Sequence, residues 1–393
     1  MTQRRYEETH PWITFQLNME QASPSLWMLM GEAESKCAHV AGVPLLPAIH
    51  QYFQQLYLVK GAVATTTIEG NTLTEEEVSL LSERKLQVPP SLEYQKQEVE
   101  NVLEGFNLIA ERMLGGYPKD ISVEEIKDHN RLILKNTLLQ EDVFPGEIRH
   151  HSVEVGGYLG APSQDCEYLL EKLCAWLNNA DGSFTYPPRH KLAYEILKAI
   201  VAHLYLAWIH PFGDGNGRTA RLVEYRIMLS AGIPAVSAHL LSNHYHQTRA
   251  EYYRQLSLSS QAGSPMSFIQ YAFEGLVDQL RDQVETIKAQ QITVHWHDYV
   301  DELFRDRATK VAQRQKMLIL RLSEEINPVP VSQMRYLSPW LAEVYAGKNA
   351  RAIDRDVKEL MRMGLVVSTE NGYRARKEII LAFLSPVRDG DQQ

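Results

Sequence analysis

The sequence contains few cysteines, and none of them is spaced to form a shared metal or redox site. Cys37, Cys166 and Cys174 are the only three in 393 residues, and no two of them form a CxxC pair. Three cysteines cannot build a disulfide framework, so a small disulfide-rich secreted fold is excluded. Unpaired thiols are typical of a reducing compartment, and we therefore expect a cytoplasmic protein.

Long hydrophobic runs are also missing. The first twelve residues contain no apolar segment of the kind found in secretory signals. The most apolar stretch, Ile196 to Ile209, is interrupted by Lys198 and His203 and is shorter than the roughly 20 residues that span a bilayer. We predict a buried core helix there and no membrane contact. Hydrophobic residues still make up 44% of the chain, so a sizeable core can form.

An excess of positive charge is absent as well. The net charge is −9, which argues against a protein whose whole surface binds nucleic acid. Its distribution is uneven, because residues 301–388 carry 16 basic and 11 acidic side chains, a net +5, whereas residues 1–300 carry −12. The C-terminal part could contact DNA, but a charge of +5 is modest and favours a protein-docking or dimer module.

Helical patterns dominate the chain, and we predict a mainly α fold. A short hairpin over 148–159 is the exception, with alternating valines before a glycine pair. The predicted helices of the first 300 residues cover 51–64, 74–81, 95–114, 123–134, 166–178, 191–209, 219–231 and 252–280, the last as one helix or two.

Three parts are predicted along the chain. Residues 1–99 form an N-terminal helical segment, residues 100–285 form the core, and a boundary falls within 289–301. Residues 300–388 then contain three helices, predicted at 310–326, 331–345 and 350–363, followed by a hairpin from residue 365. Three helices and a hairpin are the pattern of a winged helix-turn-helix module.

The most informative segment runs from His210 to Arg221 (HPFGDGNGRTAR). Three glycines at alternating positions permit a turned backbone whose N–H groups converge. The helix that follows directs its positive dipole end to the same place, and Arg218 and Arg221 add charge on one of its faces. This combination is typical of a polyphosphate site.

Two further side chains suit that site. Asp214 is a lone carboxylate, which could hold Mg²⁺ together with substrate phosphates. His210 follows the buried helix and could act as a general base. Other motifs do not fit, because a Walker loop needs a different spacing, a dinucleotide fingerprint needs a preceding strand, and an EF-hand needs more acidic ligands.

The segment from His210 to Arg221 matches the signature HPFxDGNGRxxR at every fixed position, and the chain thereby resembles the Fic (filamentation induced by cAMP) family. The resemblance implies a Fic-type helical core with a hairpin flap, and transfer of AMP from ATP to a protein hydroxyl (AMPylation) with release of pyrophosphate. In this scheme His210 deprotonates a Ser, Thr or Tyr hydroxyl, and Asp214 holds Mg²⁺. The loop residues implied to bind the nucleotide are Gly213, Asp214, Gly215, Asn216, Gly217, Arg218, Thr219 and Arg221.

Two other segments resemble elements of the family. Residues 152–165 resemble the flap, whose tip contacts the nucleotide and adds the target chain by strand pairing; the tip residues are Val155, Gly156, Gly157 and Tyr158. Tyr252 and Tyr253 resemble the tyrosine pair beside the adenine. A tyrosine pair on an apolar helix is also typical of a core, so both interpretations stay open.

Residues 65–70 (TTTIEG) resemble the family's inhibitory motif, [S/T]xxxE[G/N], through Thr65, Glu69 and Gly70. Their position before the catalytic motif implies the subgroup with an N-terminal inhibitory helix. Glu69 would pair with Arg221 and occupy the space of the ATP γ-phosphate. On its own, a glutamate before a glycine is also an ordinary helix end, and three threonines are typical of a solvated face.

Several alternatives remain. The same site could remove AMP from a modified protein, or use another donor such as UTP or CDP-choline. The core could also be silent in a DNA-binding regulator, although the complete motif argues against silence. The expected partners are a target protein, which could be the chain itself, and a second copy in a homodimer.

Overall fold

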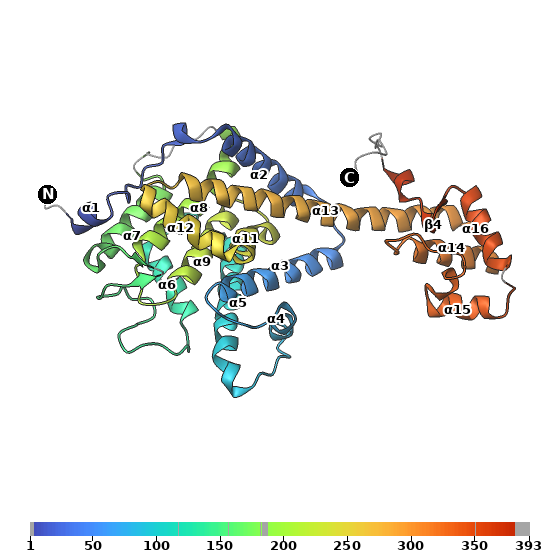
Figure 1. Ribbon diagram of the computed structural model, residues 1–393, viewed down its shortest axis with the longest axis horizontal. Coiled ribbons are helices and arrows are strands. Elements are labelled where there is room, and N and C mark those ends of the chain that lie inside the picture. Colours follow the sequence, from blue (N-terminus) through green and yellow to red (C-terminus); the bar gives the residue numbers. More distant parts are fainter. Residues whose placement is uncertain are drawn as a thin grey trace. The chain divides into compact units, whose positions relative to one another are not determined.

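The structure is a computed structural model that describes residues 4–116, 118–155, 157–180, 182, 188–349 and 351–381. The chain folds into two compact units, Met1–Val284 and Glu285–Gln393. Both are mainly helical, as predicted from the sequence, and the strands of the described residues are short (Figure 1). The cavity described below lies within the first unit.

Helix α8 (Lys191–Ile209) is the centre of the first unit, and nearly all of its last fourteen residues are buried. It contacts α2 (Pro24–Gly42), α7 (Ser163–Leu177) and α9 (Asn216–Ser230), which explains why it is apolar on all sides. By length and composition α8 could cross a membrane, but 78% of it is buried inside the protein. The prediction of a buried core helix is confirmed.

The other elements of this unit follow the predicted order, with α1, α2, α10 and α11 not foreseen. Their bounds are α1 Arg5–Thr9, α3 Pro47–Thr67, α4 Glu75–Ser82, α5 Glu93–Leu114, α6 Val123–Ile133, β1 Glu154–Val155, β2 Tyr158–Leu159, α10 Ala235–Ala238, α11 Leu240–Gln247, α12 Arg249–Ala262 and α13 Met266–Phe304. The segment predicted as one or two helices at 252–280 is divided between α12 and α13, because Gly263 takes a left-handed φ of 61°.

The hairpin is shorter than predicted. Only β1 and β2 pair, in an antiparallel register that places Glu154 opposite Leu159, whereas Ile148 pairs with Phe212 of the motif loop. The guanidinium of Arg149 is buried and donates to the carbonyls of His151 and Ala161, at 2.5 Å each. These side-chain bonds replace the strand ladder that the sequence pattern indicated before residue 154.

The predicted boundary at 289–301 lies inside a helix. Helix α13 continues to Phe304, and the two units divide at residues 284 and 285. Trp296, Val300 and Phe304 follow one another at a spacing of four and are buried in the core of the second unit. That helical spacing explains why the chain does not break there.

After the end of α13, the described part of the second unit contains three further helices and then a hairpin, in the predicted order. The bounds are α14 Lys310–Leu322, α15 Pro339–Ala346, α16 Arg351–Arg362, β3 Val366–Thr369 and β4 Gly372–Ala375. Helix α15 begins eight residues later than predicted, because residues 334–336 form a separate 3₁₀ turn. The classification of the second unit as a winged helix stays a prediction. Residues 350 and 382–388 of the predicted module lie outside the described residues.

Asp356 joins the three helices of this unit. Its buried carboxylate accepts hydrogen bonds from Arg314 at 2.6 and 3.0 Å, from Gln315 at 3.0 Å and from the Tyr345 hydroxyl at 2.8 Å. A carboxylate can be buried at little net cost only when its partners satisfy it in this way.

We therefore expect Asp356→Ala to destabilise the second unit by about 3 kcal/mol, because it leaves the Arg314 charge buried without its partner. The measurement is hydrogen exchange of α14 and α16 amides in the full chain. Glu359→Gln, which removes an exposed pair with Arg362, is the control and should leave exchange unchanged. Equal exchange in the two variants would contradict the central role of Asp356.

Candidate active site

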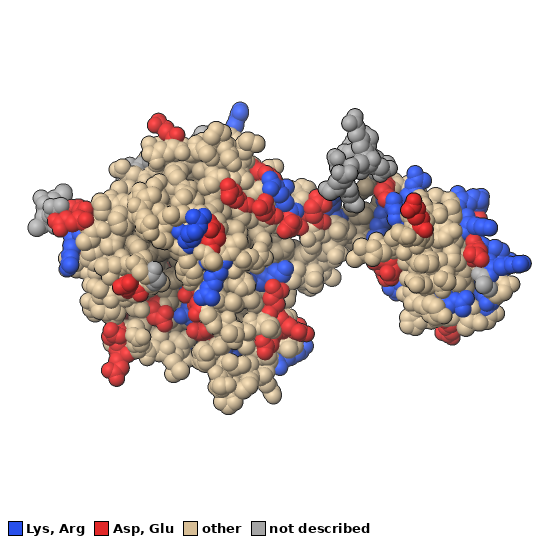
Figure 2. Space-filling view, viewed as in Figure 1, with Lys and Arg blue, Asp and Glu red and all other residues tan. Residues whose placement is uncertain are grey.

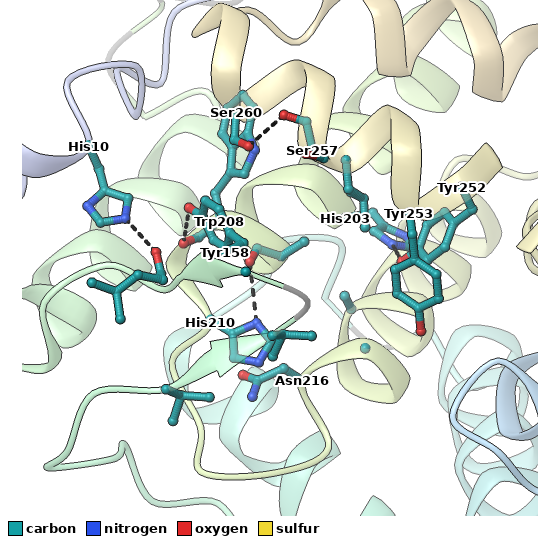
Figure 3. Close-up of a pocket in the computed structure, with 18 of the residues that line it drawn as sticks. His10, Tyr158, His203, Trp208, His210, Asn216, Tyr252, Tyr253, Ser257 and Ser260 are labelled. Atoms are coloured by element: carbon teal, nitrogen blue, oxygen red, sulfur yellow. Dashed lines mark hydrogen bonds between the residues drawn. The ribbon is translucent and has the colours of Figure 1, made fainter. Parts of the chain in front are cut away.

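A cavity of about 1000 Å³ brings the predicted motifs together at the C-terminal end of α8. Figure 3 shows His10 at one side of it and Tyr252 and Tyr253 at the other, with His210 between them. The predicted site residues that line it are Glu69, Val155, Gly157, Tyr158, His210, Gly213, Asp214, Gly215, Asn216, Gly217, Tyr252 and Tyr253. Gly156 lies outside the described residues.

His210 is held at the C-terminal end of α8 in an unusual conformation. Its φ of 50° is rare for a residue other than glycine, and Arg149 Nε donates to its carbonyl at 2.7 Å. Nδ1 lies 3.4 Å from the Ala207 carbonyl, which can only accept, so Nδ1 carries the proton and Nε2 keeps its lone pair. Burial lowers the pKa of His210 to about 4. The imidazole is therefore neutral at pH 7 and able to take a proton.

Asn216 keeps the glycine loop in shape. Its Oδ1 accepts from the Phe212 N–H at 2.9 Å, and its Nδ2 donates to the Phe212 carbonyl at 2.8 Å. The side chain is thus bonded to the backbone of the loop on both of its polar atoms. Helix α9 begins at this residue, after Gly215 with a φ of 75°. The first N–H groups of α9 have no partners within the helix and form an anion-binding end.

Asn130 on α6 was not singled out by the sequence, yet it fixes the other side of the loop. It is fully buried, donates to the Asp214 carbonyl at 2.9 Å and to the Thr219 hydroxyl at 3.2 Å, and accepts from the Gly146 N–H at 2.9 Å. Thr219 is therefore a buried loop support that does not line the cavity, and its contact with the nucleotide stays a prediction. No local pattern links Asn130 to residues more than 80 positions away.

The two arginines of the motif are buried and do not line the cavity. Arg218 pairs with Glu98 at 3.1 Å and lies 3.5 Å from Asp214. Arg221 donates from Nε to the Thr65 hydroxyl at 2.5 Å, and from Nη2 to the Thr65 carbonyl at 2.9 Å and to Glu69 at 2.6 Å. The predicted pairing of Glu69 with Arg221 is present, and the two contacts with Thr65 add to it.

Glu69 reaches the first turn of α9. A Cβ atom at Gly217 would collide with Glu69 Oε1, so the carboxylate occupies the space that the glycine leaves open. Burial by itself raises the pKa of Glu69, but the charges of Arg221 and Arg218 outweigh it and hold that pKa below its ordinary value. The carboxylate is therefore ionised at neutral pH. Gly70 ends the segment with a φ of 102°.

The tyrosine pair satisfies both interpretations that the sequence left open. Tyr252 is buried, and its hydroxyl lies 2.8 Å from Nε2 of His203, yet its ring still reaches the cavity. Tyr253 is 39% exposed and donates to the Ile68 carbonyl at 3.3 Å, next to Glu69. Tyr252 is a core residue at the cavity wall, whereas Tyr253 is accessible.

Within the described residues, no group of three or more His, Cys, Asp or Glu side chains is arranged to hold a metal ion. Asp214 is a single carboxylate at the cavity wall and is 50% exposed, and its Oδ1 accepts from the Gly215 N–H at 2.5 Å. One carboxylate together with substrate phosphates is a ligand set that Mg²⁺ accepts. Asp214 therefore fits the predicted cation as a partial ligand.

Known proteins resemble the chain in sequence and in fold. Residues 120–228 match the model of the Fic/DOC family. Protein adenylyltransferase fic-1 of Caenorhabditis elegans is 30% identical over 207 residues, which are 53% of this chain and 37% of that protein. Protein adenylyltransferase Fic of Drosophila melanogaster is 28% identical over 222 residues, 56% of this chain and 39% of that protein. The chain thus spans less than two fifths of these curated relatives.

Solved structures agree at the level of the fold. A Fic family protein from Desulfovibrio desulfuricans superposes with a TM-score of 0.55 and 19% identity, covering 90% of this chain and 97% of that one. Fic-1 from C. elegans superposes with a TM-score of 0.53 and 24% identity, over 67% and 73% of the two chains. The family match and the signature loop within it show that residues 120–228 form a Fic/DOC domain.

Proposed function

We propose that the chain is a protein adenylyltransferase, which moves AMP from ATP to a Ser, Thr or Tyr hydroxyl of a target protein. The observation that carries the proposal is the neutral His210 imidazole in the same cavity as the N-terminal end of α9. Phosphoryl-type transfer needs a base for the nucleophile and fixed charge around the phosphates. The names of the relatives, protein adenylyltransferases, support it.

The reaction assigns a task to each part of the loop. The target hydroxyl attacks the α-phosphorus of ATP while Nε2 of His210 takes its proton. The bond from the α-phosphorus to the bridging oxygen breaks, and pyrophosphate leaves with that oxygen. The N–H groups of Asn216 and Gly217 would bind phosphate oxygens, with Arg218 and Arg221 behind them. Asp214 would hold Mg²⁺ beside the phosphates, where the cation neutralises charge.

Glu69 would inhibit this reaction by filling the anion site. Its carboxylate lies against Gly217 and is bonded to Arg221, so a phosphate group can use that space only after displacing it. Thr65 holds the same guanidinium through its hydroxyl and its carbonyl. These contacts support an inhibitory role for Thr65 and Glu69. Gly70 ends the segment that carries them.

The second unit supports a further candidate function, nucleic-acid binding. Arg351, Arg355, Lys358 and Arg362 are exposed on α16 at spacings of four, three and four, and so form one stripe opposite its buried face. Figure 2 shows Lys and Arg side chains gathered on the part of the unit that contains α16. A stripe of this kind suits phosphate contacts better than the net charge alone indicated. Protein docking and a homodimer stay predictions.

The cellular location is also part of the proposal. All three cysteines are unpaired and buried. This supports the expectation of a reducing, cytoplasmic compartment. A target protein of that compartment is therefore the expected acceptor, together with the chain itself.

The first test is incubation of the full chain with α-labelled ATP and Mg²⁺. Glu69→Gly is expected to label itself or a lysate protein roughly tenfold faster than wild type, since the charge-assisted bond that it removes is worth about 1.5–3 kcal/mol. Glu83→Gly, which removes an exposed carboxylate outside the cavity, is the matched control and should behave as wild type. Adding His210→Ala to Glu69→Gly should abolish the label.

Other outcomes identify the alternatives. An absence of label in Glu69→Gly would contradict adenylyl transfer. Release of AMP from a pre-labelled protein by wild type, but not by Glu69→Gly, would favour the removal reaction instead. Thermal-shift measurements with ATP, UTP and CDP-choline distinguish the donors, and only ATP is expected to stabilise Glu69→Gly strongly.

Gly217→Ala tests whether the Glu69 carboxylate packs against Gly217. The added methyl group displaces the carboxylate from Arg221, and overpacking of this kind costs about 1–3 kcal/mol, so the melting temperature should fall by a few degrees. In the Glu69→Gly background the same substitution should cost much less, which a double-mutant cycle measures. Gly31→Ala is the control, because a Cβ there meets nothing within 4 Å. An equal loss in both backgrounds would refute this arrangement.

The α16 stripe is tested with a short random-sequence DNA duplex at low salt and the full chain. Arg355→Glu should weaken binding for every sequence and lower the slope of log affinity against log salt by about 1. Lys310→Glu, an exposed charge reversal elsewhere in the unit, should have a smaller effect. If wild type binds no duplex at low salt, α16 is not a nucleic-acid surface.

A further inference from the structure

We propose that residues 4–15, here called the strap, form a wall of the active cavity, and that His10 is a positioning residue for the hairpin of β1 and β2. The strap lies outside residues 120–228 that match the family model, and the motif had not drawn attention to it. The effect of His10 on ATP binding rests on the proposed adenylyl transfer. Its effect on the stability of the hairpin does not.

The strap is fixed to the core at both ends. Near its start, Arg4 pairs with the buried carboxylate of Asp165 on α7 at 3.3 Å, and the Tyr6 N–H donates to the same carboxylate at 2.9 Å. Near its end, Phe15 stacks on Tyr205 of α8 with ring centroids 4.8 Å apart. Two anchors on neighbouring helices hold the segment between them in place.

The middle of the strap reaches the cavity. Thr9, His10 and Trp12 line the same cavity as His210. The ring of His10 lies 5.1 Å from that of Trp12 and meets Tyr158 edge-on at 6.0 Å. His10 is only 4% exposed, although it belongs to a short segment near the start of the chain. The strap therefore closes the cavity on the side away from Tyr252 (Figure 3).

His10 holds the hairpin through one backbone atom. Its Nε2 lies 2.9 Å from the Leu159 carbonyl, which can only accept, so Nε2 carries the proton. Nδ1 then faces the Thr9 hydroxyl at 2.8 Å, and that hydroxyl also donates to the Arg5 carbonyl at 3.2 Å. Burial lowers the pKa of His10, which keeps the ring neutral. The bond to Leu159 is therefore maintained at neutral pH.

This bond determines which edge of the hairpin can pair with an added strand. Paired residues of an antiparallel hairpin alternate between bonded and non-bonded, and Leu159 directs its carbonyl away from its partner Glu154. His10 occupies the place that a further strand would need on the β2 side. An extended peptide segment can therefore add only at the outer edge of β1, at Glu154, beside the exposed Val155.

Hydrogen exchange tests the structural part in the full chain. His10→Phe keeps the ring but removes the donor, and the amides of residues 157–160 should exchange roughly fivefold faster. His10→Gln retains an N–H at the place of Nε2 and should exchange within twofold of wild type. His39→Ala, which changes an exposed histidine on α2, is the control. Unchanged exchange in His10→Phe, or equal exchange in the Phe and Gln variants, would overturn the proposal.

Kinetics in the Glu69→Gly background test the catalytic part. With self-labelling by α-labelled ATP as the probe, His10→Phe should raise KM for ATP several-fold with less effect on kcat, and His10→Gln should restore it. A fall in kcat alone, or no rescue by Gln, would contradict positioning through the hairpin. If Glu69→Gly shows no label at all, adenylyl transfer is wrong, while the exchange experiment still decides on the strap.

Discussion

The buried guanidinium of Arg221 is the group on which the site depends. Its side chain has no solvent exposure, so its charge must be satisfied within the protein. Thr65 and Glu69 supply three acceptors, and in doing so they fasten the end of α3 to the second turn of α9. The free protein is thus stabilised by the carboxylate that fills its anion site. Under the proposed function, stability of the free state and low activity have one physical cause, because an incoming phosphate must replace Glu69 as the partner of Arg221.

Around Arg221 and Glu69, one set of groups fixes the shape of the site and another set is available for its chemistry. Asn130, Asn216 and Arg149 commit their side chains to backbone atoms of the loop or of the hairpin base, and all three are buried. These bonds leave the N-terminal N–H groups of α9 and Nε2 of His210 directed to the cavity. Buried polar side chains with all their bonds made give a rigid frame, which charge stabilisation in a transition state requires.

The part of the site formed by residues close together in the chain could be predicted from the sequence. Residues 210–221 follow one another along the chain, so their spacing alone predicts the loop, the base and the arginine face, and α8 was predicted with the bounds that the structure shows. Asn130, Glu98 and His10 could not be found in this way, because each acts on a residue more than 80 positions away. The segment 289–301, where a boundary was predicted, lies inside α13 for a related reason. The spacing of Trp296, Val300 and Phe304 indicates a continuing helix only once the core that buries them is known.

The two elements that close the cavity differ in charge, and this difference determines which of them a nucleotide can move. Glu69 is an ionised carboxylate bonded to Arg221, and it has the same sign as a phosphate, so the two cannot share that guanidinium at low cost. His10 is neutral, and it holds the hairpin through a bond between uncharged groups. An anionic ligand therefore competes directly with Glu69 but has no electrostatic reason to displace His10. It follows that an anionic ligand can displace Glu69 at the phosphate end of the cavity while the bond from His10 to the hairpin stays in place.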